Sequence, residues 1–237
     1  MHVLVAQRVH LADATGPAAV RAECVVRKFT VNGMVHQPAG NFYDKYNTKN
    51  PVARALMRGF LESFDELVEM AGTAGNALEI GCGEGELSMR LVKAGWQVQG
   101  CDIAAEAVSE ARQRAAAAGL SIAFEQREIA DCAGAYAAQD LVVCCEVMEH
   151  LEHSLAALDT LASLSCRHVL VSVPREPIWR VLNMARGRYW SALGNTPGHI
   201  QHWSKRGFVE LLEQRLDVIA VRSPLPWTLA LCRVRAS

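Results

Sequence analysis

The sequence has none of the features that mark a membrane-spanning or secreted protein. No apolar stretch approaches the roughly 18 residues that a spanning helix needs. The first ten residues, which include Arg8 and His10, lack the continuous apolar core of a secretory signal. None of the eight cysteines belongs to a C-x-x-C pair, and most lie in apolar runs. Zinc ribbons and disulfide frameworks are therefore disfavoured, and we expect a protein of the reducing cytoplasm.

An excess of charge of either sign is also missing. Charged residues make up 21% of the chain and the formal net charge is −1. A neutral chain lacks the basic footprint of a general nucleic-acid binder, so we expect no nucleic-acid partner. With 237 residues, 51% of them hydrophobic, the chain is long enough for one large domain, or for one domain with an appendage.

The chain divides into two parts, and the pattern of apolar residues is less regular in the first part than in the second. Residues 1–40 contain short alternating pieces between glycines and prolines, and we expect a loosely attached N-terminal extension that includes a hairpin. Residues 41–237 form the main domain. Asn50 and Pro51 are typical of a helix N-cap and first helical position. The helix that they begin is expected to end at Gly72.

Strands and helices then alternate with short connections. The apolar pattern predicts strands at 77–80, 96–103, 121–126, 140–145 and 168–173, and helices at 86–94, 104–118, about 155–162 and 204–215. This alternation predicts an α/β domain whose parallel sheet is covered by helices on both faces. The apolar runs 217–221 and 228–234 flank "RSPLPW", which predicts an antiparallel C-terminal hairpin at the sheet edge.

The strongest local signal is the glycine-rich turn "LEIGCGEGEL" at residues 78–87. Gly81, Gly83 and Gly85 follow an expected strand and precede an expected helix, as in turns that approach a ligand with their backbone. Asp102 ends the next strand, where a carboxylate can hold both hydroxyls of a ribose. A dinucleotide is disfavoured because the spacing is G-x-G-x-G and Glu79 would repel a pyrophosphate. A turn without any ligand is the remaining alternative.

These segments carry a family resemblance. "ALEIGCGEGEL" and "VQGCDIAAEAV" resemble the first two motifs of class I S-adenosylmethionine-dependent methyltransferases, and "DLVVCCEVMEHLEH" resembles their fourth-strand motif, over roughly residues 74–174. The E-x-x-E-H run and "GNTPGHIQHWSKRGFVELL" are most similar to the ubiquinone-pathway O-methyltransferases, from whose pattern Pro197 and residues 174–196 depart. The resemblance implies a Rossmann-like, seven-stranded, mostly parallel sheet with an antiparallel C-terminal hairpin.

The resemblance also implies S-adenosyl-L-methionine as the cofactor. Glu79 and the backbone of the glycine turn would hold its methionyl part, Asp102 its ribose, and Glu146 would begin the loop under the sulfonium. The residues expected to bind the cofactor are Glu79, Gly81, Cys82, Gly83, Gly85, Asp102, Ile103, Ile129, Ala130 and Glu146. Ile103 would pack on the adenine, and Ile129 and Ala130 would contact it through backbone and packing.

A dense acidic and histidine cluster, "CCEVMEHLEHS", follows the fourth strand at residues 144–154. If 146–153 is helical, Glu146, Glu149, His150 and His153 share one face. In the family that the chain resembles, this run is proposed to bind a metal, which implies a site of Glu146, Glu149 and His150, with magnesium favoured over zinc. The alternative is that these side chains only line the cofactor loop.

Residues 174–203 are the expected substrate lid. His199 matches the family's G-x-H position and is the candidate general base, with His150 and Glu149 as further candidate catalytic residues. The alternative for His199 is a loop histidine that only orders the lid. The segment 177–190 is basic and aromatic, which suits contact with an aromatic or anionic substrate or with a membrane surface. The alternative for the whole segment is a packed insertion helix with solvated arginines.

We therefore expect an enzyme that methylates a small-molecule hydroxyl on a phenol, a quinol or a natural-product scaffold. Loss of the hydroxyl proton requires a base or a cation, because a phenol has a pKa near 10. An N- or C-methyltransferase on the same fold, a nicotinamide-binding oxidoreductase and a non-catalytic methyltransferase-like protein remain alternatives.

Overall fold

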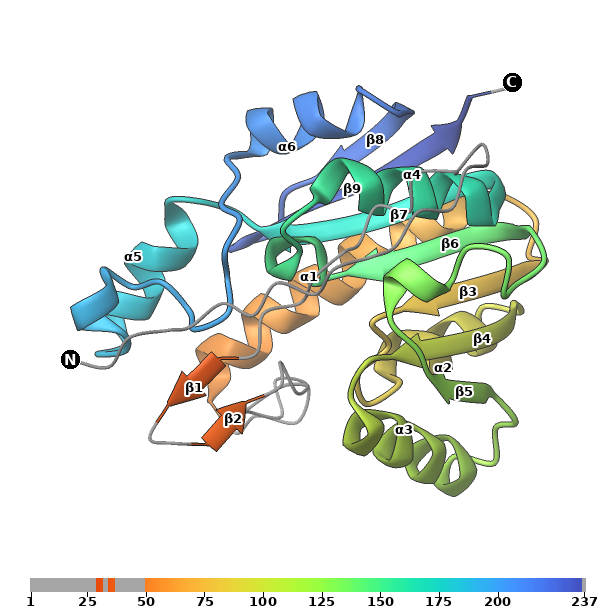
Figure 1. Ribbon diagram of the computed structural model, residues 1–237, viewed down its shortest axis with the longest axis horizontal. Coiled ribbons are helices and arrows are strands. Elements are labelled where there is room, and N and C mark those ends of the chain that lie inside the picture. Colours follow the sequence, from red (N-terminus) through yellow and green to blue (C-terminus); the bar gives the residue numbers. More distant parts are fainter. Residues whose placement is uncertain (1–28, 32–33, 37–49, 236–237) are drawn as a thin grey trace, which may run out of the picture.

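The computed structural model describes residues 29–31, 34–36 and 50–235. Its centre is a seven-stranded sheet of order β5-β4-β3-β6-β7-β9-β8 (Figure 1). The strands are β3 (Asn76–Ile80), β4 (Gln97–Asp102), β5 (Ala123–Gln126), β6 (Gln139–Cys145), β7 (Ser165–Pro174), β8 (Leu216–Arg222) and β9 (Trp227–Val234). Strands β3 to β7 pair in parallel, whereas β9 runs antiparallel between β7 and β8. The expected mostly parallel sheet with an antiparallel C-terminal hairpin is confirmed.

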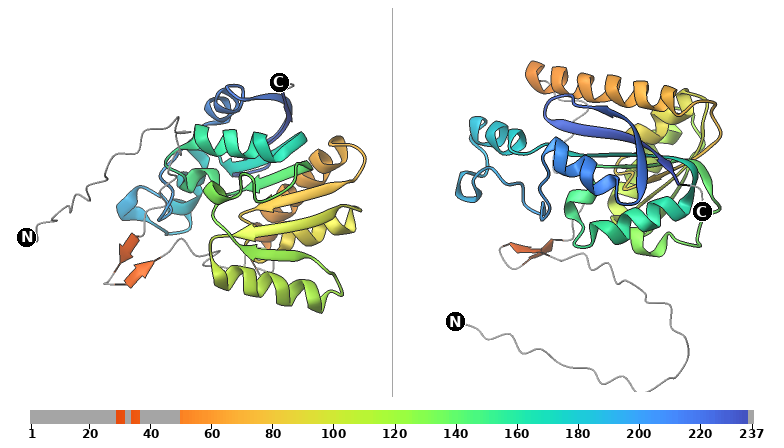
Figure 2. Two further views of the ribbon diagram at one scale, coloured as in Figure 1. Left: turned by 45° about the vertical axis from the view of Figure 1, so that its right-hand side comes forward. Right: turned by 90° about the horizontal axis from the view of Figure 1, so that it is seen from above.

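Helices cover both faces of this sheet, as expected (Figure 2). The helices are α1 (Pro51–Met70), α2 (Glu86–Lys93), α3 (Ala105–Ala117), α4 (Ser154–Leu164), α5 (Ile178–Ala185) and α6 (Lys205–Leu212). One buried cluster joins α1 and α2 to the sheet, and a second joins α4 and α6 to its other face. The central strands are apolar along nearly their whole length because both of their sides are buried.

The long first helix begins where the sequence predicts. The Asn50 side chain accepts hydrogen bonds from the backbone N–H groups of Val52 (2.9 Å) and Ala53 (3.3 Å), and Pro51 occupies the first helical position. These contacts satisfy N–H groups that the first helical turn leaves without partners. Gly72 has a φ of +90°, a left-handed conformation that stops the helix.

Ahead of α1, the structure describes a short antiparallel pair, β1 (Phe29–Val31) and β2 (Met34–His36). The rest of the expected N-terminal extension, and residues 41–49, lie outside the described residues. The loose attachment of residues 1–40 therefore stays a prediction.

The expected lid segment leaves the sheet at the carboxyl end of β7. It contains α5 and a 3-10 turn, η3 (Trp190–Ala192), and Figure 1 shows α5 standing outside the sheet. Arg175 and Trp203 form an isolated parallel bridge, so the segment starts and finishes at the same place. In the described part of the chain, no helix has both the length and the apolar character needed to cross a membrane.

Candidate functional site

The glycine turn between β3 and α2 is built on left-handed backbone. Gly81, Gly83 and Gly85 have φ angles of +73°, +50° and +81°, which residues with a Cβ rarely adopt. The carbonyl of Cys101 on β4 accepts hydrogen bonds from the N–H groups of Gly81 (2.8 Å) and Cys82 (2.9 Å). The turn is therefore fixed against the carboxyl end of the neighbouring strand.

Two of these glycines have different surroundings. A Cβ on Gly81 would lie 2.2 Å from Cγ2 of Val147, whereas a Cβ on Gly83 would have nothing within 4 Å. Gly81 thus lets the segment after β6 approach the turn, and Gly83 faces open space. The short 3-10 turn η2 (Met148–His150) begins directly after Val147, so it lies beside the glycine turn.

Asp102, the expected ribose ligand, lies at the end of β4. One of its carboxylate oxygens accepts from the N–H of Gly83 and the other from that of Ala104, each at 2.9 Å. Burial raises the pKa of Asp102, while these backbone N–H groups oppose the rise. Each carboxylate oxygen has a second lone pair and can therefore also accept a ribose hydroxyl.

Glu79 is buried inside β3, with 2% of its surface exposed. The Ser88 hydroxyl, from the first turn of α2, donates a short hydrogen bond to its carboxylate. Burial raises the pKa of Glu79 to about 8, against the opposing effect of Ser88. In the absence of a cation the carboxyl is therefore largely protonated at neutral pH, and a cationic ligand end would favour its ionised form. Sequence reasoning missed Ser88.

The other expected cofactor residues have different degrees of exposure. Cys82 is buried and packs in a cluster with Phe124, and its thiol lies 3.8 Å from the carbonyl oxygen of Gly83. Ile103 is half-buried, and its carbonyl accepts from the Gln126 side chain. The 3-10 turn η1 (Ile129–Asp131) buries the first of its residues in the core and exposes the second, Ala130.

Glu146 corrects one expectation. Residues 146–153 do not form a helix, because Glu146 has a left-handed φ of +60°, η2 is a single turn and α4 begins only at Ser154. The Glu146 carboxylate accepts from the Ser172 hydroxyl (3.0 Å) and from the Trp227 indole N–H (2.7 Å). These contacts with β7 and β9 hold its side chain apart from the expected metal set. His153 is the exposed N-cap of α4.

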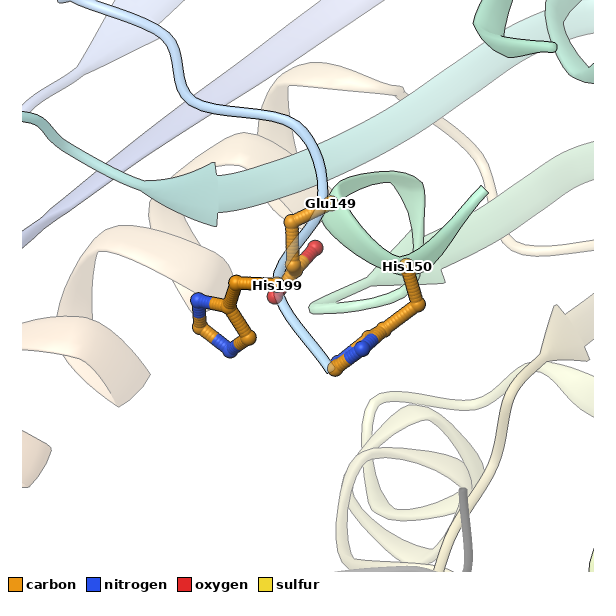
Figure 3. Close-up of side chains that lie close together, drawn as sticks. All are labelled: Glu149, His150 and His199. Atoms are coloured by element: carbon orange, nitrogen blue, oxygen red, sulfur yellow. The ribbon is translucent and has the colours of Figure 1, made fainter. Parts of the chain in front are cut away.

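The three expected catalytic residues come together. Glu149 and His150 are on η2, and His199 is on the returning loop of the lid (Figure 3). Each offers one ligand or proton-accepting atom, and these atoms lie within 4.8 Å of one another. Figure 3 shows the Glu149 carboxylate beside the two imidazole rings, which meet each other edge to face. The sequence predicted Glu149 and His150 in one candidate group and His199 in another. The structure brings these three together, and Glu146 is not a member of the group.

Backbone contacts join the two segments that carry this group. The carbonyl of Glu149 accepts from the N–H groups of Ile200 (2.9 Å) and Gln201 (3.0 Å). Nδ1 of His150 lies 3.0 Å from the carbonyl oxygen of Gly198. A carbonyl only accepts, so Nδ1 carries the proton of this bond, and a neutral His150 keeps its lone pair on Nε2.

The His199 ring is enclosed by other rings. Its centroid lies 4.9 Å from that of His150, nearly perpendicular, and 5.8 Å from that of Trp179, at 28°. His199 is buried, with 9% of its surface exposed. His202, the other histidine of the segment, contacts the Asn195 side chain instead (2.8 Å) and lies outside the group.

Comparisons with known proteins find similarity to methyltransferases. Residues 77–165 match a family model described as a methyltransferase domain. A magnesium-protoporphyrin O-methyltransferase from Synechocystis is 33% identical over 133 residues, 52% of this chain and 56% of that protein. A ubiquinone biosynthesis O-methyltransferase from Xanthomonas axonopodis is 32% identical over 127 residues, 53% of this chain and 52% of that protein. The chain thus spans about half the length of the curated relatives that it matches.

Solved structures extend the similarity over a larger share of the chain. The Synechocystis magnesium protoporphyrin IX methyltransferase with bound S-adenosylhomocysteine has a TM-score of 0.63 at 22% identity, covering 81% of this chain and 91% of that one. An N-methyltransferase from Bradyrhizobium japonicum, also with S-adenosylhomocysteine, has a TM-score of 0.58 at 20% identity, with 81% and 92% covered. At these identities the likeness shows the fold. The fold and the family resemblance expected from the motifs are confirmed.

Proposed function

We propose that this chain, whose fold and matched domain are those of the class I S-adenosylmethionine-dependent methyltransferases, methylates a hydroxyl group of a small molecule. The observation that carries the proposal is the convergence of Glu149, His150 and His199 within 4.8 Å. This group begins two residues after Val147, which contacts Gly81 of the glycine turn. Proton-accepting groups therefore lie beside the expected cofactor site.

The chemistry requires such an arrangement. The methyl group of a sulfonium is already activated, so the protein mainly has to align it with the nucleophile and exclude water, which lowers the barrier by about 7–11 kcal/mol in intramolecular reactions. A phenol, with a pKa near 10, also has to lose its proton at neutral pH. A positioned general base contributes typically about 10²–10⁴-fold to the rate of such a step.

We assign the proton-accepting role to His199, with His150 and Glu149 as its partners. His199 is buried and its ring is fixed between His150 and Trp179, so its nitrogens have a defined direction. The Glu149 carboxylate, which is 2% exposed, would stabilise the imidazolium that forms when a proton arrives. The lone pair of neutral His150 is on Nε2, which makes that atom a second acceptor.

The cofactor is assigned to the glycine turn and its acidic neighbours. Asp102 would accept the ribose hydroxyls, and ionised Glu79 would face the cationic methionyl end, with Ser88 holding its carboxylate. Ile103, Ile129 and Ala130 remain proposed adenine contacts. Glu146 would support the loop under the sulfonium rather than bind a metal, because Ser172 and Trp227 hold its carboxylate.

Oxygen as the accepting atom is supported by two O-methyltransferases among the relatives, which match half of their length. The fold does not decide this point, because an N-methyltransferase shares it. Phenols, quinols and natural-product scaffolds remain the expected acceptors. The domain match favours methyl transfer over the nicotinamide alternative.

Turnover with matched acceptors tests the proposal. The purified protein is incubated with S-adenosylmethionine and a panel of catechols and quinols, and S-adenosylhomocysteine is measured beside the methylated product. We expect product from free hydroxyls and none from the corresponding methyl ethers. Transfer to amines but not to hydroxyls would replace O- with N-methylation. Cofactor binding by calorimetry without transfer to any acceptor of either class would support the non-catalytic alternative.

A second candidate is that the same three side chains bind a divalent cation, which would lower the pKa of a bound hydroxyl. Their donor atoms are close enough for this. Two imidazoles and one carboxylate suit zinc, manganese or iron better than magnesium, which prefers oxygen ligands. Metal analysis of the purified protein and turnover after chelation decide between the candidates. Full activity in metal-free protein rules out a required cation.

We also propose a cytoplasmic location and contact of residues 177–190 with a membrane surface. The seven cysteines within the described residues are free thiols, which suits a reducing compartment. Val181 and Trp190 expose 53% and 65% of their surfaces in a segment that also carries Arg186 and Arg188. Co-sedimentation with anionic vesicles, compared between the wild type and Trp190→Ala, tests the contact. Equal recovery of both proteins in the supernatant argues against it.

A further inference from the structure

Thr196 lies where the lid helix α5 meets the turn that carries His199. Its hydroxyl oxygen accepts two hydrogen bonds from α5, one from the Trp179 indole N–H (2.9 Å) and one from the Asn183 amide (3.1 Å). The same Asn183 amide also donates to the carbonyl of Gly194 (2.9 Å). One hydroxyl thus connects two side chains that stand four residues apart on the helix.

The other side of Thr196 leads to the imidazole. The N–H of His199 donates to the carbonyl of Thr196 (3.1 Å), which closes the turn 196–199. The Trp179 ring that donates to the hydroxyl also stacks on the His199 ring. His199 is therefore connected to α5 twice, through the backbone of Thr196 and through the face of Trp179.

These connections restrict the movement of Thr196 and its two donors, Trp179 and Asn183, which together we call the hub. Asn183 is 2% exposed, and its side-chain oxygen accepts from Arg186, so both ends of its amide are used. A buried amide or indole N–H loses free energy when its acceptor is removed, because water does not replace it. A displacement of α5 away from the turn would break both hydrogen bonds to Thr196.

We propose that Thr196 is a positioning residue for methyl transfer, which joins the lid helix to His199 so that the helix and the imidazole keep one relative geometry. The inference rests on the proposed role of His199 as proton acceptor. Its consequence is specific: the hydroxyl of Thr196 acts on turnover and not on cofactor binding. The side chains assigned to the cofactor have other partners: Asp102 bonds to the backbone of Gly83 and Ala104, and Glu79 to the Ser88 hydroxyl.

A matched pair of substitutions tests the role of the hydroxyl. Thr196→Val keeps the shape but removes the acceptor, whereas Thr196→Ser keeps the acceptor. We expect kcat of Thr196→Val to fall on the order of tenfold to a hundredfold, as for a misplaced reacting group, with Kd for S-adenosylmethionine unchanged. Thr196→Ser should retain kcat within about threefold of the wild type, since an intact hydrogen bond leaves the geometry in place.

The donor side gives a second, independent test. Trp179→Phe keeps a ring against His199 but removes the indole N–H, so it should lower kcat in the same direction. Because Trp179→Phe and Thr196→Val both remove the hydrogen bond between the indole and the hydroxyl, the double variant should be less impaired than the product of the two single effects. Trp96→Phe, which removes an indole N–H in the buried cluster of α1, α2 and the sheet, is the control and should leave kcat unchanged.

The outcomes separate this inference from the proposed function. Wild-type kcat in Thr196→Val, or an equal loss of cofactor affinity, would overturn the positioning role. If the wild-type protein methylates no acceptor, the indole N–H resonance of Trp179 still reports on the hub. It should shift in Thr196→Val and stay in place in Thr196→Ser. An unchanged resonance in Thr196→Val shows that the hydrogen bond, and with it the inference, is wrong.

Discussion

The site has a proposed cofactor side, the glycine turn with Glu79 and Asp102, and a proposed acceptor side, η2 with the lid. Different kinds of contact stabilise these two sides. On the cofactor side, the groups lie close in sequence, from Glu79 to Asp102, and most contacts are made by backbone N–H and carbonyl groups of β3, β4 and the turn between them. On the acceptor side, η2 and the lid are distant in sequence. Backbone hydrogen bonds from Ile200 and Gln201 to Glu149 join them, and single side-chain atoms of His150 and Thr196 add contacts to the lid segment that carries His199.

This difference predicts that the two sides tolerate side-chain substitutions to different degrees. The backbone of the glycine turn keeps its hydrogen bonds under most side-chain substitutions. On the cofactor side, therefore, only substitutions of the charged groups should weaken cofactor binding. The acceptor side depends on single side-chain atoms placed by a segment outside the sheet. Small displacements there should affect turnover before they affect cofactor binding.

The largest expected effect is on the acceptor side. His199→Ala should lower kcat by about 10²–10⁴-fold, the usual contribution of a general base, while Kd for S-adenosylmethionine stays within about twofold, a change worth less than about 0.5 kcal/mol. Steady-state kinetics and calorimetry on the same preparation measure the two quantities. His202→Ala, which removes an imidazole from the same lid but from outside the group, is the matched control. Equal kinetics of His199→Ala and the wild type would remove His199 as the proton acceptor.

The backbone geometry of the cofactor side could be predicted from the sequence, because its determinants are local, whereas the binding roles of its residues stay predictions. Gly81, Gly83 and Gly85 signal a left-handed turn, and Asp102 ends the next strand, where parallel strands bring it to the same edge. The contact that sequence reasoning missed is that of Ser88, which lies in the first turn of α2. A serine there has no pattern that distinguishes it from an ordinary helix residue.

The acceptor side was predicted only in part. The expected helix at 146–153 was wrong because periodicity ignores the left-handed Glu146, whose carboxylate is held by Ser172 and Trp227 from two other strands. The hub at Thr196 depends on a tryptophan and an asparagine that only the folded lid brings to it. Such contacts have no spacing signal in a sequence, since they are set by tertiary structure.

The second-largest expected effect is a loss of cofactor affinity, which depends on the proposed cofactor side alone. Asp102→Ala should weaken S-adenosylmethionine binding by about 3 kcal/mol or more, since each hydrogen bond to a charged group contributes about 1.5–3 kcal/mol. That corresponds to roughly a hundredfold in Kd. Asp102→Asn keeps one acceptor oxygen, so its Kd should lie between that of the wild type and that of Asp102→Ala. Calorimetry measures the series, and an affinity of Asp102→Ala equal to that of the wild type would end the ribose assignment.

The smallest expected effect is the contribution of Glu79 to the pH dependence of the free energy of unfolding. Its pKa is about 8 in the folded protein and 4.5 as a free side chain, so between these values the native state binds more protons than the unfolded state. This group therefore lowers the free energy of unfolding as pH rises from about 4.5 to about 8. Glu79→Gln, which cannot ionise, should remove that dependence, as measured by denaturant unfolding across this range.

Cofactor binding should show the opposite dependence on pH, because a cationic methionyl end favours ionised Glu79. Below pH 8 the carboxyl has to release its proton on binding, so affinity should rise with pH by at most about tenfold per unit. Calorimetry at pH 7 in buffers of different ionisation enthalpy should detect the released proton in the wild type, and a smaller release in Glu79→Gln. Equal proton release by the two proteins would mean that Glu79 stays protonated beside the cofactor. The polarity of the buried Glu79–Ser88 pair, rather than its charge, would then explain why an acid stands inside the strand.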